Sequence, residues 1–170
     1  SIIPNETRIT PYVGIRNLGC TCYINSLFQI FYSIPQLRQG ILNCECEINE
    51  KNSLYQLKKI FYTLTYSESS YCSTEDFCNN FDNDKLKTGE QMDIDEFFNT
   101  LLDRMERHLK PTSNADLVKY FFEGRNSDDL IFTCGHKRSN EFSFYSTQLQ
   151  VKGKKSLEES LTAIIEGEVM

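Results

Sequence analysis

Two cysteines lie where a glycine-containing loop gives way to a helical pattern. Cys20 and Cys22 follow Gly19, and from Tyr23 onward apolar residues recur at helical spacing until Pro35. Backbone N–H groups at a helix start have no intrahelical acceptor, and together with the positive end of the helix dipole they stabilise an anion. Cys22 is therefore the candidate nucleophile, as a thiolate. The face expected to be apolar consists of Tyr23, Leu27, Ile30, Phe31 and Ile34.

The loop before Cys22 contains a candidate oxyanion donor. Asn17 precedes Cys22 by five residues, and Gly14 and Gly19 permit the tight backbone turns that would bring its side chain back toward the thiol. An amide N–H in that position can stabilise the oxyanion of a tetrahedral intermediate. Thr21 is placed to cap the helix. Position alone leaves open the alternative that Cys22 is a small buried hydrophobic residue.

Ten residues around Cys22 fall into one continuous pattern: Gly14, Asn17, Leu18, Gly19, Thr21, Cys22, Tyr23, Asn25, Ser26 and Gln29. This pattern resembles the cysteine box of the ubiquitin-specific proteases, Gly-x-x-Asn-Leu-Gly-x-Thr-Cys-Tyr-x-Asn-Ser-x-x-Gln. The resemblance implies that Cys22 attacks the isopeptide carbonyl at the ubiquitin C-terminus and that Asn17 helps to hold the oxyanion. Cys20 stands at a variable position of the box.

A second motif begins at Gly89 and reads Gly-Glu-Gln-Met-Asp-Ile-Asp-Glu-Phe-Phe. Asp93 is a good helix N-cap, and Glu96 occupies the third helical position as in a capping box. The segment also resembles the family's Gln-Gln-Asp-x-x-Glu-Phe motif, which implies that Asp93 and Glu96 hold the arginine-containing tail of ubiquitin through charge-assisted hydrogen bonds. Gln91 and Asp95 are assigned to the same tail, although Asp95 stands where the family usually carries Gln. An apolar stripe expected in the core follows: Ile94, Phe97, Phe98, Leu101, Leu102, Met105 and Leu109.

Composition is typical of an intracellular enzyme domain. The 170 residues are 39% hydrophobic and 12% aromatic, which suffices for one domain or part of a larger one. Seven scattered cysteines favour reduced thiols over a disulfide framework. The sequence shows no signal-peptide pattern and no apolar run of membrane-spanning length, so we expect a cytoplasmic or nuclear location without membrane contact. The net charge of −6 disfavours nucleic acid as a partner.

Periodicity and capping residues predict the remaining elements. The segment at 43–52 is polar and acidic and is expected to be a surface loop. The other predicted elements are a helix at 53–66, a helix within 73–81, a short helix at 114–121, strands at 130–134 and 141–152, and a helix that begins at Ser156 with a capping box.

No metal or other cofactor is expected. The spacing of the cysteines in the first half lacks the two close Cys-x-x-Cys pairs of a zinc ribbon or finger, so free thiols are favoured there. Those cysteines are Cys44, Cys46, Cys72 and Cys78. Further on, Cys134 and His136 resemble half of the metal-binding motif of the family's fingers, with Ile131 where the first cysteine would stand.

The general base is missing from the recognised motifs. A cysteine protease of this kind needs an imidazole to accept the thiol proton and an Asp or Asn to orient it. His108 lies near the end of a helix, where a surface position would suit it, and His136 lies in the incomplete metal motif. Neither histidine matches the family's histidine box. The resemblance thus implies the N-terminal half of a catalytic domain, with the remaining half of that domain as a further expected partner.

The fold implied by the resemblance is an α+β, papain-like cysteine protease fold. A helical thumb is expected over about 12–121 and the start of the β-rich fingers and palm over about 122–170. The hypothesis for function is a deubiquitinating cysteine protease whose partners are ubiquitin and ubiquitinated proteins. Three alternatives stay open: a ubiquitin-binding or scaffolding module without catalysis, a thiol redox protein using Cys20 and Cys22, and an enzyme for a ubiquitin-like modifier.

Overall fold

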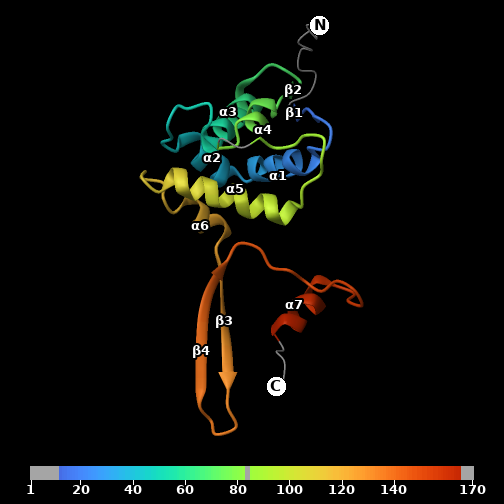
Figure 1. Ribbon diagram of the computed structural model, residues 1–170, viewed down its shortest axis with the longest axis vertical. Coiled ribbons are helices and arrows are strands. Elements are labelled where there is room, and N and C mark those ends of the chain that lie inside the picture. Colours follow the sequence, from blue (N-terminus) through green and yellow to red (C-terminus); the bar gives the residue numbers. More distant parts are fainter. Residues whose placement is uncertain (1–11, 83–84, 166–170) are drawn as a thin grey trace. The chain divides into compact units, whose positions relative to one another are not determined.

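The chain has a mixed α and β structure that divides into two compact units, residues 1–122 and 123–170. The computed structural model describes residues 12–82 and 85–165. Across these ranges no helix combines the length and apolarity needed to cross a membrane. Figure 1 shows the elements, which are β1 (Gly14–Ile15), α1 (Cys22–Ser33), α2 (Pro35–Asn43), α3 (Ser53–Tyr66), β2 (Tyr71–Cys72), α4 (Glu75–Asn79), α5 (Ile94–Leu109), α6 (Leu117–Phe122), β3 (Gly124–Ile131), β4 (Lys137–Phe144) and α7 (Leu157–Ile165).

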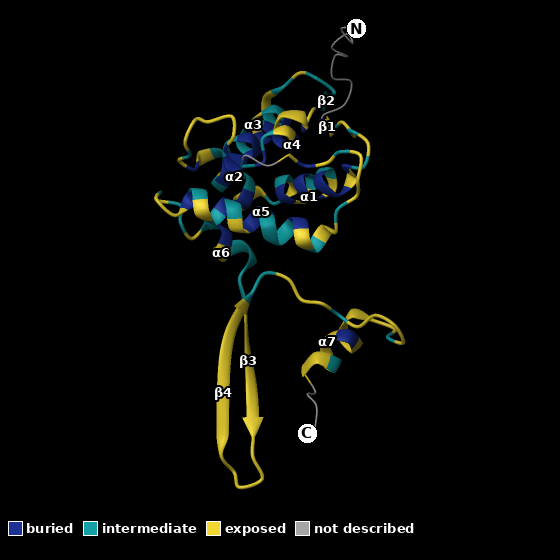
Figure 2. Cartoon of the chain, viewed as in Figure 1, coloured by how far each residue is buried: buried dark blue, intermediate teal, exposed yellow. Residues whose placement is uncertain are grey.

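Aromatic rings from α1, α4 and α5 form the centre of the first unit. The ring of Phe28 meets that of Phe77 edge-on with centroids 4.9 Å apart, and Tyr23 meets Phe97 in the same way at 5.2 Å. Burial of each such ring contributes roughly 1.5–3 kcal/mol of transfer free energy. Figure 2 shows the buried residues on the inward faces of these helices.

The buried face of α1 differs from the expected one. Ile30 is 57% exposed, whereas Ile24 and Phe28 are fully buried. The prediction for Ile30 was therefore wrong. Since α1 packs against both α2 and α5, its buried arc is set by two neighbours rather than by a single apolar stripe.

The helix over 53–66 is confirmed at both ends. Asn52 caps α3, because its side-chain oxygen accepts a hydrogen bond of 3.0 Å from the backbone N–H of Tyr55.

α2, in contrast, was not predicted, since Pro35 was interpreted as the end of a helix. Pro35 instead occupies the first position of α2, where its missing N–H has no cost.

A two-residue parallel ribbon anchors the chain just before Cys22. Gly14 pairs with Tyr71 and Ile15 with Cys72. The backbone N–H of Arg16 adds a hydrogen bond of 2.9 Å to the carbonyl of Cys72. The ribbon thereby fixes where the cysteine-containing loop leaves the body of the first unit.

The second unit contains an exposed antiparallel hairpin, β3–β4, and the helix α7. Its strands pair from Gly124↔Phe144 to Ile131↔Lys137, so the predicted strands were placed too far toward the C-terminus. β3 begins with polar residues on both faces, which gives no alternating hydrophobic signal. The predicted start of α7 at Ser156 is confirmed, because its hydroxyl accepts a hydrogen bond of 3.3 Å from the N–H of Glu159.

Candidate active site

Cys22 is the first residue of α1, and its side chain is exposed. It thus lies where the first-turn N–H groups have no intrahelical acceptor. Thr21 precedes it but does not cap the helix through its side chain, contrary to expectation. The Thr21 hydroxyl instead accepts a hydrogen bond from the N–H of Leu18 at 3.0 Å and holds the loop. The first turn of α1 therefore keeps its donors for another acceptor.

The side-chain oxygen of Asn17 organises the same loop. It accepts hydrogen bonds from the N–H of Gly19 at 3.2 Å, the N–H of Thr21 at 3.4 Å and the Thr21 hydroxyl at 3.1 Å. Three donors on one oxygen fix the orientation of the amide plane. The Nδ2 donors are therefore at the other end of an amide whose orientation is fixed, and Asn17 is exposed.

Two other residues of the cysteine box tie this loop to α1. Asn25 donates from Nδ2 to the carbonyls of Ile15 and Arg16 at 3.5 and 3.3 Å, and Gln29 donates to the carbonyl of Val13 at 3.2 Å. Asn25 and Gln29 lie one helical turn apart, so they bind carbonyls of one short segment, Val13, Ile15 and Arg16. Their amides explain, in physical terms, two positions of the pattern that take no part in chemistry.

Gly19 lets the loop contact the segment before α5. Its φ is +122°, and a Cβ there would lie 2.8 Å from the carbonyl oxygen of Thr88. The same oxygen accepts a hydrogen bond of 2.7 Å from the N–H of Cys20. Sequence reasoning missed Thr88; the turn-forming Thr88-Gly89 pair was the available signal. This contact joins the two motifs.

The acidic residues lie around the beginning of α5. Asp93 caps the helix, since its Oδ1 accepts from the N–H groups of Asp95 at 2.8 Å and Glu96 at 3.3 Å. Asp93, Glu96 and Gln91 are exposed, and Asp95 is half-buried. The expected N-cap is confirmed. In the stripe that follows, Ile94 is 48% exposed and so departs from the predicted core.

The packing of α1 on α5 brings their first turns together (Figure 1). Tyr23, next to Cys22, contacts Phe97, next to Glu96. Burial raises the pKa of Tyr23, and the thiolate forms of Cys78 and Cys22 would raise it further. Tyr23 is therefore a neutral hydrophobic anchor between the cysteine and the acidic turn.

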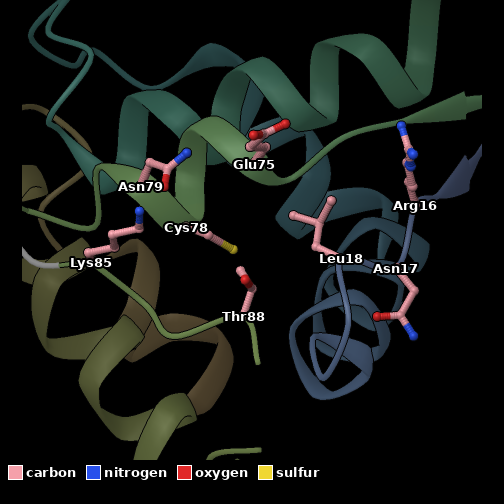
Figure 3. A pocket seen from close by; sticks show the side chains of 8 residues that line it. All are labelled: Arg16, Asn17, Leu18, Glu75, Cys78, Asn79, Lys85 and Thr88. Atoms are coloured by element: carbon pink, nitrogen blue, oxygen red, sulfur yellow. The ribbon is translucent and has the colours of Figure 1, made fainter. Parts of the chain in front are cut away.

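A polar pocket of about 490 Å³ adjoins the loop on the side of α4. Figure 3 shows Cys78 extending from α4 toward the middle of the pocket and Leu18 extending from the opposite wall. Burial raises the pKa of the Cys78 thiol to about 11, so this cysteine is a neutral thiol. The described lining of the pocket includes Asn17.

His108 is held by residues other than those around Cys22. His108 contacts the carboxylate of Asp82 through Nε2 at 2.9 Å and the amide of Asn52 through Nδ1 at 3.1 Å. Its side chain is 25% exposed and that of Asp82 10%, so the surface position expected for His108 is wrong. His108 joins the end of α5 to the start of α3, because Asp82 also accepts from the N–H of Ser53 at 2.8 Å.

His136 and Cys134 lie in the turn of the hairpin in the second unit. The N–H of Gly135 donates to the carbonyl of Phe132 at 2.9 Å, with Gly135 at φ +83°. Cys134 is exposed. Throughout residues 12–82 and 85–165, no three His, Cys, Asp or Glu side chains gather in a way that could hold a metal ion.

The family model for ubiquitin carboxyl-terminal hydrolase matches residues 13–156. Among similar curated proteins, ubiquitin carboxyl-terminal hydrolase 24 of Mus musculus is 35% identical over 94% of this chain. Ubiquitin carboxyl-terminal hydrolase 7 of Caenorhabditis elegans is 33% identical over 98%, and ubiquitin carboxyl-terminal hydrolase 34 of Homo sapiens is 34% identical over 90%. The aligned chain spans 6%, 15% and 4% of those three proteins.

The match covers the loop, Cys22, the acidic turn of α5 and the hairpin. The chain belongs to the ubiquitin carboxyl-terminal hydrolase family. This membership was predicted from the two motifs and is confirmed.

Proposed function

We propose that this chain carries the nucleophile-bearing part of a thiol-dependent deubiquitinase. Its fold would be papain-like, with the helical thumb over about 12–121 and the start of the fingers and palm over about 122–170. The observation that supports this most strongly is the exposed Cys22 at the start of α1, beside an Asn17 amide oriented by three hydrogen bonds.

In the proposed reaction, the Cys22 thiolate attacks the carbonyl carbon at the ubiquitin C-terminus. The negative charge that develops on the carbonyl oxygen is stabilised by Nδ2 of Asn17 and by a backbone N–H of the first turn of α1. The amine leaves with a proton, and water then hydrolyses the thioester. Since the Asn17 oxygen is held by the loop, little reorganisation is required when the charge forms.

The acidic turn of α5 would hold the basic tail of ubiquitin. Asp93 uses Oδ1 as the helix cap, which leaves its second carboxylate oxygen to accept from an arginine of the tail. Exposed Glu96 and Gln91 and half-buried Asp95 supply further acceptors on the same turn. The contact between Thr88 and Cys20 sets the position of this turn relative to the nucleophile.

The imidazole and its orienting Asp or Asn would come from residues outside this sequence. His108 is committed to Asp82 and Asn52, and His136 does not match the family's histidine box. The same fact favours a second candidate function, a ubiquitin-binding module that retains the cysteine box without catalysis.

The test is reaction with ubiquitin that carries a thiol-reactive electrophile at its C-terminus, followed by intact mass. An adduct is expected on the wild-type chain and on Cys20→Ala, the matched neighbouring thiol, but not on Cys22→Ala. Ubiquitin binding without an adduct, both on this chain and on a longer chain that includes a histidine box, would select the binding module instead. If the chain shows no binding to ubiquitin and forms no adduct, both functions are refuted.

A further inference from the structure

A second pair of cysteines lies together at the end of α2. Cys44 directly follows the last residue of α2 and is 1% exposed, and its thiol donates a hydrogen bond of 3.1 Å to the carbonyl of Ile41. Cys46 is half-buried, and its thiol lies close enough to that of Cys44 for each to affect the pKa of the other. One thiol of the pair therefore meets solvent while the other lies in the core.

Lys58 on α3 places a positive charge beside this pair. Its Nζ donates to the backbone carbonyl of Cys44 at 2.7 Å. Burial raises the pKa of the Cys44 thiol to about 11 and also raises that of Cys46, while the ammonium of Lys58 opposes both increases. The thiols are thus neutral at pH 7, and the charge of Lys58 favours whatever thiolate forms as the pH rises.

We propose that Cys44 and Cys46 form a reversible intramolecular disulfide, a redox-sensitive site separate from Cys22. The oxidant is a low-molecular-weight disulfide such as oxidised glutathione. The Cys46 thiolate attacks one sulfur of this oxidant, forms a mixed disulfide and releases one thiolate. Cys44 loses its proton to that thiolate and attacks the sulfur of Cys46. This releases the second thiolate, which takes up the proton that Cys46 gave to water at the start. Two protein thiols are oxidised, and one external disulfide is reduced to two thiols.

The local geometry assigns different roles to the two cysteines. Cys44 is fixed by the hydrogen bond of 2.9 Å from its N–H to the carbonyl of Gly40 and by its burial, whereas Cys46 lies in a loop of mostly exposed residues. Cys46 is therefore the thiol that meets the oxidant, and Cys44 is the resolving thiol. A disulfide between residues two apart closes a small, strained ring, and strained disulfides are the readily reduced ones.

The chain contains a matched control, because Cys20 and Cys22 have the same Cys-x-Cys spacing. Cleavage by trypsin after Arg38 and Lys51 isolates Cys44 and Cys46 in the peptide 39–51, and cleavage after Arg16 and Arg38 isolates the control pair in 17–38. The folded chain is equilibrated in graded mixtures of reduced and oxidised glutathione, alkylated, digested and weighed. A disulfide appears as a loss of about 2 Da without alkylation of either cysteine.

We expect peptide 39–51 to become oxidised at a ratio of oxidised to reduced glutathione at least about threefold lower than peptide 17–38 requires. In denaturant the two pairs should behave alike, because only the fold brings Cys44 and Cys46 into contact. Lys58→Met should slow oxidation of 39–51 in the folded chain and leave the denatured chain unchanged. If the folded chain oxidises 39–51 no more readily than the denatured chain does, the pair is a protected core feature and the proposal is wrong.

Discussion

Replacement of Gly19 with alanine tests whether the close approach of the cysteine loop to Thr88 positions Cys22, the proposed nucleophile. An alanine must adopt a φ near +122°, a region that side-chain-bearing residues rarely occupy. Its Cβ would also lie 2.8 Å from the Thr88 oxygen, a backbone atom that cannot rotate away. The loop or the segment before α5 must therefore shift.

The two effects can be weighed separately. Backbone strain of this kind costs about 1–3 kcal/mol. A shift that lengthens the 2.7 Å hydrogen bond from Cys20 to Thr88 costs about 1 kcal/mol more. We expect Gly19→Ala to lower the free energy of unfolding by about 2–4 kcal/mol. Because strain concentrates next to Cys22, the rate of reaction with ubiquitin electrophile should fall even where the chain remains folded.

Urea unfolding followed by circular dichroism measures the first quantity, and intact mass against time measures the second. Gly89→Ala is the matched control, since its Cβ would meet nothing within 4 Å and its φ is not in the left-handed region. If Gly19→Ala and Gly89→Ala agree within about 0.5 kcal/mol and react at equal rates, the close approach has no energetic role.

Three further predictions concern the elements that hold the site. Asp93→Ala should lower stability by about 1 kcal/mol through loss of the α5 cap, as measured by urea unfolding. Asp82→Asn should cost about 1–2 kcal/mol at pH 7, because hydrogen bonds from the Ser53 N–H and from His108 outweigh burial and hold the pKa of the Asp82 carboxyl below its ordinary value of 3.8. The contribution of the Asp82 carboxylate to stability is fully present above its ordinary pKa and is lost as the pH falls through its lower pKa in the folded state. The difference in unfolding free energy between wild type and Asp82→Asn should therefore disappear in acid. Phe97→Ala should cost about 3–5 kcal/mol, since four aromatic rings contact Phe97 in the core.

Each of these has its own control. Asp93→Ser keeps a capping oxygen without charge, so it should restore stability but not the binding of a basic ubiquitin tail; equal loss in Ser and Ala variants would contradict the capping account. A gap between wild type and Asp82→Asn that stays constant from pH 7 into acid would contradict the role of its charge. Phe97→Leu should recover more than half of the loss in Phe97→Ala, and failure to do so would point to ring-specific contacts.

Where periodicity was regular, the sequence predicted structure well. α5 begins directly after Asp93, its predicted cap, and α3 begins where apolar periodicity placed it, although its Asn52 cap was not predicted. The predictions of secondary structure and burial failed where the type of a residue was compatible with two different positions. Pro35 ends one helix and starts the next, and Ile30 belongs to an apolar stripe but is exposed.

The candidate site could be predicted in its parts but not in its connections. Cys22, Asn17 and Asp93 follow from local motifs, because a helix start and a cap are local features. The contact of Cys20 with Thr88 and the engagement of His108 by Asp82 depend on residues distant in the chain. Such contacts leave no period in the sequence, so only the tertiary structure shows them.

The short ribbon β1–β2 has a consequence for the order of folding. It joins Gly14 and Ile15 to Tyr71 and Cys72, with the whole of α1, α2 and α3 between them in the chain. Contacts between such distant residues carry a high entropic cost of loop closure and form late, after the helices have associated. Cys22 and its loop would therefore become ordered among the last parts of the first unit. Hydrogen exchange should show that the loop of Cys22 opens more often than the core of α5. Damage to the helical core would therefore disorder Cys22 before the whole domain unfolds.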